Sequence, residues 1–278
     1  MARVIAIANQ KGGVGKTTTA VNLAASLAVA ERRTLLIDGD PQGNATSGTG
    51  IDRASFERTT YDILLGAADI RNTRLRGVQF QHLDVVPATP DLAGAEVELV
   101  DMPDREQRMR NAIHTVRDEY EYVLIDCPPS LGLITLNMLA AADALIIPLQ
   151  CEYYALEGLS QLLNTVHLIQ HSVNPSLTIA GVLLTMYDAR LNLSRQVATD
   201  AREYFGAQVF QTVVPRNVRL AEAPSFGKPI VLYDVQSIGA QSYIAVAHEL
   251  LARETEARPQ LHHELTSVVD GSAHEAST

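Results

Sequence analysis

The chain is poor in several residue types that mark particular classes of protein. Its 278 residues include no tryptophan and only two cysteines, Cys127 and Cys151. These form no C-x-x-C pair, which argues against a disulfide framework and against a zinc or iron–sulfur site built within this chain. We expect both to be buried structural thiols. No apolar run reaches the roughly 18 residues that a membrane-spanning helix needs. No charged-then-apolar leader opens the sequence. A cytoplasmic protein without membrane attachment is therefore expected.

Lysine is also scarce, and charge is unevenly distributed. The only lysines are Lys11, Lys16 and Lys228, and two of them lie in one glycine-rich segment. A compact ammonium suits phosphate binding, and arginine is not a simple substitute for it. The net charge of −10 argues against indiscriminate nucleic-acid binding. However, residues 186–230 hold six basic and four acidic side chains, so the overall sign does not exclude nucleic acid.

The sequence alternates strand-like and helix-like segments. The expected strands are short apolar runs without alternation, which is typical of a parallel sheet covered by helices on both faces. We therefore predict an α/β fold, a doubly wound and mostly parallel sheet. Residues 1–253 are expected to form one domain, and the acidic segment 254–278 a disordered tail. Strands are predicted at 3–8, 34–37, 83–87, 122–125, 144–149, 177–185 and 208–214, and helices at 17–33, 61–65, 91–100, 105–119, 133–142, 156–170, 192–205 and 238–253.

The segment "NQKGGVGKTTTA", residues 9–20, follows the first predicted strand and ends in the Gly15-Lys16-Thr17 of a phosphate-binding loop. Glycines let the backbone approach a phosphate closely, and the following helix directs its positive end at the anion. Lys16 is expected to neutralise the β- and γ-phosphates, and the Thr17 hydroxyl to bind Mg²⁺. The loop departs from the common pattern at Gln10, where glycine is usual, and at Lys11, which adds a second lysine.

Three aspartates follow predicted strands, where a parallel sheet places its ligands. Asp126 ends "YVLID" and fits a carboxylate that holds Mg²⁺ through water. Asp40, in "LLIDGDP", is a candidate to orient the attacking water. Asp38 is as consistent with a cap or turn residue as with a functional one. The N-K-x-D motif of guanine recognition is absent, so ATP is the expected nucleotide.

Four motifs together resemble a known family. They are "KGGVGKTT" from residue 11, "DGDPQGNATSG" from residue 38, "LIDCPPS" from residue 124 and "VVPRNVRLAEAPSFGKPI" from residue 213. In this order they resemble the ParA/Soj group of chromosome and plasmid partition ATPases, which carry a deviant Walker A motif. The resemblance covers roughly residues 3–253. It is closest to the short, chromosomal type, since the extra N-terminal DNA-binding domain of larger plasmid members is lacking.

The resemblance implies slow ATP hydrolysis and an ATP-dependent sandwich homodimer that binds double-stranded DNA without sequence preference. It also implies a ParB-type partner that stimulates hydrolysis, and a location on the nucleoid. Lys11 matches the lysine that reaches the partner subunit's nucleotide. The implied catalytic residues are Lys11, Lys16 and Asp40, and the implied metal residues are Thr17, Asp40 and Asp126. The implied nucleotide-binding residues are Lys11, Gly12, Gly13, Val14, Gly15, Lys16, Thr17, Thr18, Asp126, Pro215 and Asn217. The implied DNA-binding residues are Arg219 and, on a weaker match, Arg190.

Three alternatives share such a loop. A MinD-like membrane-cycling ATPase would need a basic amphipathic C-terminal helix, but residues 261–278 contain no lysine or arginine. A relative of the nitrogenase iron protein would bridge a cluster with cysteines, and Cys127 has no convincing second cysteine beside it. A P-loop amidase or ligase would need a nucleophilic cysteine with a spaced histidine, and no such arrangement is evident.

Overall fold

The computed structural model describes the backbone of residues 1–152 and 155–272, and the side chains of residues 1–152 and 162–255. Six strands form one sheet in the order β3-β2-β4-β1-β5-β6. Every pairing in it is parallel. The predicted fold class is thus confirmed. The strands are β1 (Arg3–Ile7), β2 (Thr34–Asp38), β3 (Leu83–Val86), β4 (Tyr122–Asp126), β5 (Ala144–Gln150) and β6 (Thr178–Thr185).

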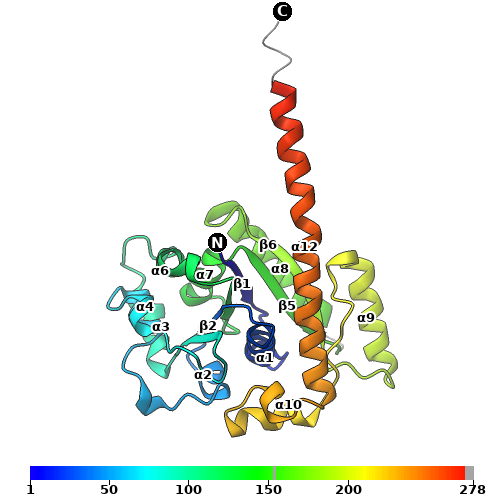
Figure 1. The fold of residues 1–278 in the computed structure, drawn as a ribbon, viewed down its shortest axis with the longest axis horizontal. Coiled ribbons are helices and arrows are strands. Elements are labelled where there is room, and N and C mark those ends of the chain that lie inside the picture. The colour runs from blue at the N-terminus through cyan, green and yellow to red at the C-terminus, as the bar shows by residue number, and fades with distance from the viewer. Residues whose placement is uncertain (153–154, 273–278) are drawn as a thin grey trace, which may run out of the picture.

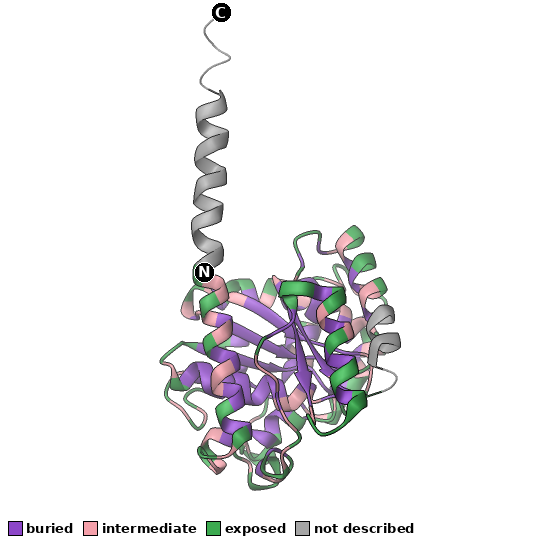
Figure 2. Ribbon diagram, turned by 90° about the vertical axis from the view of Figure 1, so that its right-hand side faces the viewer, coloured by how far each residue is buried: buried purple, intermediate pink, exposed green. Residues whose placement is uncertain are grey.

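Helices cover both faces of the sheet (Figure 1). One core joins the sheet to α1 and α12 through Leu23, Leu27 and Tyr243. The other joins its opposite face to α6 and α7 through Met109 and Met138. The helices are α1 (Lys16–Val29), α2 (Asn44–Gly48), α3 (Thr60–Leu65), α4 (Ile70–Thr73), α5 (Ala95–Glu98), α6 (Arg108–Val116), α7 (Leu133–Ala141), α8 (Ala155–Ser172), α9 (Asn192–Phe205), α10 (Val218–Glu222), α11 (Ile230–Tyr233) and α12 (Ile238–Ser272). Figure 2 shows the strands buried between these layers. Among the residues described, none of the helices is long and apolar enough to cross a membrane.

The register of the central strands decides where a site can form. Asp38 at the end of β2 pairs with Asp126 at the end of β4, and Asp126 pairs with Ile7 at the end of β1. The chain leaves β1 directly into the glycine loop. Two carboxylates and the loop therefore meet at one edge of the sheet, which we call the carboxyl edge.

The prediction of a strand at 208–214 is wrong. This segment meets β6 at an isolated bridge from Val209 to Val182 and through the Val214 amide, which donates to the Leu184 carbonyl at 2.8 Å. Just beyond the segment, Pro215 bridges to Tyr187, which follows β6. Between Val209 and Val214, the amides of Gln211 and Thr212 donate to the Glu249 carboxylate on α12, at 2.8 and 3.0 Å. These two amides therefore bond a side chain rather than β6, and no continuous ladder forms.

Several helix boundaries also differ from the sequence pattern. Helix α1 ends at Val29 rather than residue 33, because Glu31 takes a left-handed φ of 59° that a helix cannot continue. The segment 91–100 divides into a 3₁₀ turn, Pro90–Gly94, and α5. Helix α12 runs past residue 253 to Ser272. Residues 273–278 lie outside the described residues, and the proposed tail at 254–278 stays a prediction.

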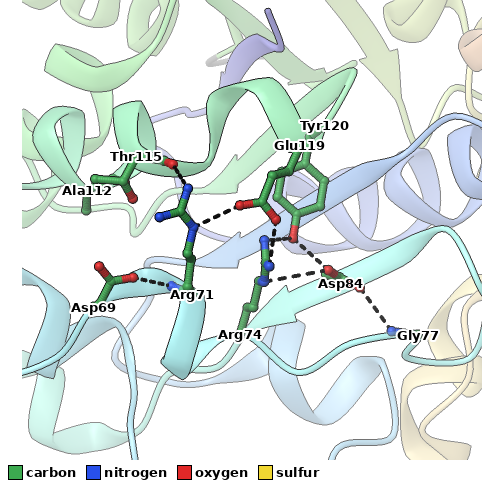
Figure 3. Close-up of polar contacts among 9 residues, drawn as sticks. All are labelled: Asp69, Arg71, Arg74, Gly77, Asp84, Ala112, Thr115, Glu119 and Tyr120. Carbon is green, nitrogen blue, oxygen red and sulfur yellow. Dashed lines mark hydrogen bonds and ion pairs between the residues drawn. The ribbon is translucent and has the colours of Figure 1, made fainter.

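A buried charge cluster closes the opposite end of the sheet, the amino edge (Figure 3). The buried Arg74 donates to the Tyr120 hydroxyl at 2.8 Å and pairs with Glu119 at 2.7 Å. The Tyr120 hydroxyl in turn donates to Asp84 at 2.6 Å. Burial raises the pKa of Tyr120, and Asp84 raises it further. Arg71 also pairs with Glu119, at 2.9 Å. This cluster ties α4 to the starts of β3 and β4.

Candidate active site

The glycine loop leaves an open cradle at the start of α1. Gly13 and Gly15 have left-handed φ angles of 76° and 88°, which other residues adopt only with strain. A Cβ atom placed on Gly12 or Gly13 would meet nothing within 4 Å. Helix α1 begins without a side-chain cap, and helix N-termini attract anions through their free amides and dipole. The Val14 carbonyl accepts from the Thr185 hydroxyl at 2.9 Å, which fixes the loop to the end of β6. The loop fits a phosphate chain.

Lys16 is the lysine of this cradle. It is only 7% exposed, and its ammonium donates to the Lys11 carbonyl at 3.1 Å. Burial lowers the pKa of Lys16, while Asp126 and Asp40 act to raise it. A buried cation with two carboxylates near it is positioned to neutralise phosphate, as the sequence predicts.

Asp126 is the best candidate for a magnesium ligand. It is fully buried, yet neither of its carboxylate oxygens has a hydrogen-bond partner among the described residues. Burial raises the pKa of Asp126 well above its usual range, and Asp38 adds to the effect, whereas the Thr17 hydroxyl and Lys16 oppose it. A buried carboxylate without partners is costly unless a cation joins it. Together with Thr17, Asp126 supplies the hydroxyl and carboxylate oxygens that suit Mg²⁺, so the residues fit the ion.

Asp38 and Asp40 have different surroundings. One Asp38 oxygen accepts from both the amide and the hydroxyl of Thr46, each at 2.7 Å, and the other accepts from the Asp40 amide at 3.2 Å. Burial raises the pKa of Asp38 to about 6, although the Thr46 bonds act against this. These bonds fix Asp38 against Thr46 and the Asp40 amide, while the choice between a structural and a functional role stays as the sequence left it. Asp40 accepts from the Gln42 amide at 2.9 Å, and its role with water stays a prediction.

A cavity of about 380 Å³ opens beside the loop and fits a nucleoside. Pro215 and Asn217, which the resemblance implies bind nucleotide, line it, and Thr18 forms part of its wall. Sequence reasoning missed Met186 and Tyr243, which line it as well. Met186 directly follows β6, so its position at a strand end was an available signal. Tyr243 lies on α12, far away in the sequence, and its hydroxyl bonds that of Thr19 at 3.1 Å.

Lys11 lies at the rim of the loop. Its side chain is 34% exposed, and its ammonium pairs with Glu152, just after β5, at 3.2 Å. The Lys11 amide donates to the Asn9 side chain at 3.0 Å. The Lys11 ammonium thus pairs with the Glu152 carboxylate, whereas the Lys16 ammonium bonds the Lys11 carbonyl. No sequence signal singled out Glu152.

The predicted DNA-binding arginines are both exposed and both ion-paired. Arg190 forms two bonds with Asp188, at 2.9 and 2.7 Å. Arg219 pairs with Glu222 at 3.0 Å and lies 3.6 Å from Asp234. Neither residue contributes to the cradle. Elsewhere, the cysteines are buried and free, as expected.

Comparisons with known proteins agree with this geometry. Residues 2–179 match the family model described as an AAA domain. The chain is 59% identical to the chromosome partitioning protein ParA of Myxococcus xanthus, over 93% of this chain and 91% of that protein. It is 58% identical to the sporulation initiation inhibitor protein Soj of Bacillus subtilis, over 91% and 99%.

Solved structures show the same fold. A Mycobacterium smegmatis protein described as cobyrinic acid a,c-diamide synthase, with bound ADP and magnesium, is 37% identical over 92% of this chain and 97% of its own, with a TM-score of 0.81. The cell division ATPase MinD of Pyrococcus furiosus is 26% identical over 91% and 99%, with a TM-score of 0.76.

The fold and the cradle define a P-loop ATPase with a deviant Walker A motif. More particularly, the chain belongs to the ParA/Soj family of chromosome-partitioning ATPases. The predicted ATPase activity is confirmed, as are ATP and Mg²⁺ as cofactors. The curated relatives, at higher identity than the synthase, favour partition over amide-forming chemistry.

Proposed function

We propose that this ATPase forms an ATP-dependent sandwich homodimer that binds double-stranded DNA without sequence preference, on the nucleoid. A ParB-type partner stimulates hydrolysis, and hydrolysis releases the DNA. The proposal rests on membership in the ParA/Soj family and on one observation above all. The loop carries two lysines in different positions, and only Lys16 is buried in the cradle.

The position of Lys11 supports a role in trans. Lys16 already supplies the cradle with an ammonium, so a second cation is not needed for the chain's own phosphates. Lys11 instead lies at the exposed rim, 3.2 Å from Glu152. A second copy facing this edge would bring its own phosphates toward that rim. Two such interactions, one from each copy, would make dimerisation depend on ATP.

Within each subunit the roles divide by position. Lys16 and the loop amides would hold the phosphates. Thr17 and Asp126 would hold Mg²⁺, whose charge would help to neutralise the phosphate oxygens. Asp40 lies at the same edge, with one oxygen bonded to the Gln42 amide. We assign it the orientation of the attacking water.

DNA binding measured with ATP, with ADP and without nucleotide tests the proposal. Retention of unrelated DNA sequences with ATP alone is the expected result, and it should weaken steeply with salt. Equal retention in all three states would contradict it. Liposome co-sedimentation with ATP tests the membrane-cycling alternative, for which we expect no ATP-dependent pelleting.

Two variants separate the steps. Lys11→Ala should bind ATP as a monomer but should not form the ATP-dependent dimer, and a dimer at wild-type levels would refute the role in trans. Asp40→Ala should accumulate the ATP-bound dimer on DNA, because hydrolysis is slowed. Turnover at the wild-type rate would exclude Asp40 from the hydrolytic step.

A further inference from the structure

Three interactions hold Lys11 within its own subunit. Its amide donates to the Asn9 side chain at 3.0 Å, and its carbonyl accepts from the Lys16 ammonium at 3.1 Å. Its own ammonium pairs with Glu152 at 3.2 Å. Both ends of the residue are therefore engaged before any nucleotide arrives.

Glu152 is held in place by its own turn. Its amide donates to the Gln150 carbonyl at 2.8 Å, and the Gln150 side chain donates to its second carboxylate oxygen. The end of β5, which leads into this turn, is also tied to the loop, because the Asn9 side chain donates to the Pro148 carbonyl at 2.8 Å. The pair of Lys11 and Glu152 thus joins two neighbouring segments that are fixed to each other.

We propose that Glu152 is the resting counter-ion of Lys11, displaced by the phosphates of a second copy's ATP. This inference rests on the proposed function, in which Lys11 acts in trans. While the subunit is alone, Glu152 holds the ammonium on its own side of the interface. A triphosphate carries more negative charge than one carboxylate, so it can replace Glu152 as the partner of Lys11.

Nucleotide bound in the subunit's own cradle also weakens the interactions that hold Lys11 within its subunit. When phosphate takes the Lys16 ammonium, the Lys11 carbonyl no longer has that donor. Only the bonds to Asn9 and Glu152 then hold Lys11 when the second copy arrives. The free energy of the Lys11–Glu152 pair therefore opposes dimerisation, and the second copy's phosphates must exceed it. The interactions of Lys11 consequently depend on the nucleotides bound to both copies.

The exposure of Lys11 and Glu152 determines how much their ion pair can oppose dimerisation. The side chains of Lys11 and Glu152 are 34% and 49% exposed, and such surface pairs are weak. A symmetric dimer breaks two of them. Removing the Glu152 charge should therefore lower the protein concentration needed for half-maximal dimerisation by roughly 2- to 30-fold.

The test measures dimer formation by sedimentation velocity, with a non-hydrolysable ATP analogue, for the wild type, Glu152→Gln and Glu152→Asp. Glu152→Gln should dimerise at lower concentration, whereas Glu152→Asp, which keeps the charge, should behave like the wild type. Glu31→Gln, at an exposed carboxylate beyond the end of α1, is the matched control and should change nothing. Monomer affinity for a fluorescent ADP should be equal in all four proteins.

Each other outcome overturns the inference. Unchanged dimerisation of Glu152→Gln would show that the pair does not restrain Lys11. Weaker dimerisation would make Glu152 part of the dimer interface rather than a competitor of it. An equal gain in Glu152→Asp would point to the shape of the turn instead of its charge. If the wild type itself stays monomeric with the analogue, the proposed ATP-dependent dimer is wrong. If the wild type dimerises and only the Glu152 variants depart from expectation, the inference about Glu152 alone is wrong.

Discussion

The two edges of the sheet both bury charged side chains, but they treat them differently. At the amino edge, the cations and anions around Arg74 are partnered by one another (Figure 3). Among the described residues of that cluster, only the Arg74 Nε lacks a hydrogen bond, and it still lies 3.9 Å from Asp84. At the carboxyl edge, neither oxygen of the buried Asp126 has a hydrogen-bond partner within the described part of the chain.

The contrast separates stability from function. A buried charge whose partners lie in the same chain ties elements together and needs nothing from outside. A buried carboxyl group whose oxygens have no hydrogen-bond partners, as at Asp126, destabilises the empty protein until a ligand supplies them. The carboxyl edge therefore has the features of a ligand-binding site, because its buried carboxyl group lacks hydrogen bonds within the chain. At the amino edge the charged side chains bond one another, and they stabilise the fold. Variants at the two edges should accordingly affect different measurements.

The largest effect is expected for Lys16→Ala. Hydrogen bonds to charged groups contribute about 1.5–3 kcal/mol each, so removing the bonds to two phosphates should weaken ATP binding roughly 100-fold or more. Titration with a fluorescent ATP analogue measures it. Lys228→Ala, at an exposed lysine outside the cradle, should leave the affinity unchanged. Affinity within a factor of two of the wild type would show that the cradle does not depend on this lysine.

Arg74→Met should do the reverse, weakening the fold but not ATP binding. Removing the buried Arg74 takes a charged hydrogen bond from the Tyr120 hydroxyl and a nearby cation from Asp84, while Glu119 keeps Arg71. We therefore expect a cost at the low end for a buried ion pair, about 3 kcal/mol. Urea unfolding measures the destabilisation. Arg71→Met removes an exposed pair with the same Glu119 and should cost less than about 1 kcal/mol. Similar costs for both variants would mean that burial of the cluster is unimportant.

Asp38 at the carboxyl edge should give the empty protein a distinct pH dependence. Its pKa is raised from 3.8 to about 6 in the folded state, so the folded protein binds the proton more tightly than the unfolded chain. Its contribution is fully present below about pH 4 and is lost as the pH rises through about 6.

Replacement by asparagine isolates this contribution. The stability of the wild type relative to Asp38→Asn should fall between pH 4 and 7 in urea unfolding without nucleotide. Asp101→Asn, at an exposed carboxylate, is the control. Parallel profiles for the wild type and Asp38→Asn would show that Asp38 is not the titrating group.

The sequence predicted the parts of this molecule that depend on local pattern. Short apolar runs indicated buried parallel strands, and the end of a strand indicated where Asp126 would lie. The segment 208–214 has the composition of a strand, yet Glu249, on a distant helix, takes two of its amides. Strand propensity could not foresee that competition.

Apart from Met186, the residues that the sequence did not reveal have partners that are distant in the sequence. Glu152 meets Lys11 across 141 positions, and Tyr243 meets Thr19 across 224. Arg74 reaches Tyr120 across 46. Such pairings are created by the order of strands in the sheet, so a motif that is contiguous in the chain cannot reveal them.

The smallest effects are expected when single surface arginines are replaced by alanine, because these side chains are exposed and already have carboxylate partners. Both Arg190 and Arg219 have carboxylate partners, but the guanidinium of Arg190 is held by two short bonds to Asp188, whereas Arg219 has one short bond to Glu222 and a longer approach to Asp234. Arg219 also lies over the Tyr233 ring, 6.0 Å from its centroid. The order of the two residues therefore rests on the family resemblance, in which Arg219 is the stronger match.

Arg219→Ala should consequently weaken ATP-dependent DNA binding more than Arg190→Ala. Each copy of the dimer would then bind one DNA phosphate fewer. The negative slope of log affinity against log salt concentration should therefore become shallower by about 2. Arg219→Glu should abolish DNA retention while the ATP-dependent dimer persists. Arg32→Ala, at an exposed arginine paired with Glu121 on the amino edge, is the control. If replacement of Arg190 or Arg32 weakened DNA binding more than replacement of Arg219, the DNA-binding surface would not include α10.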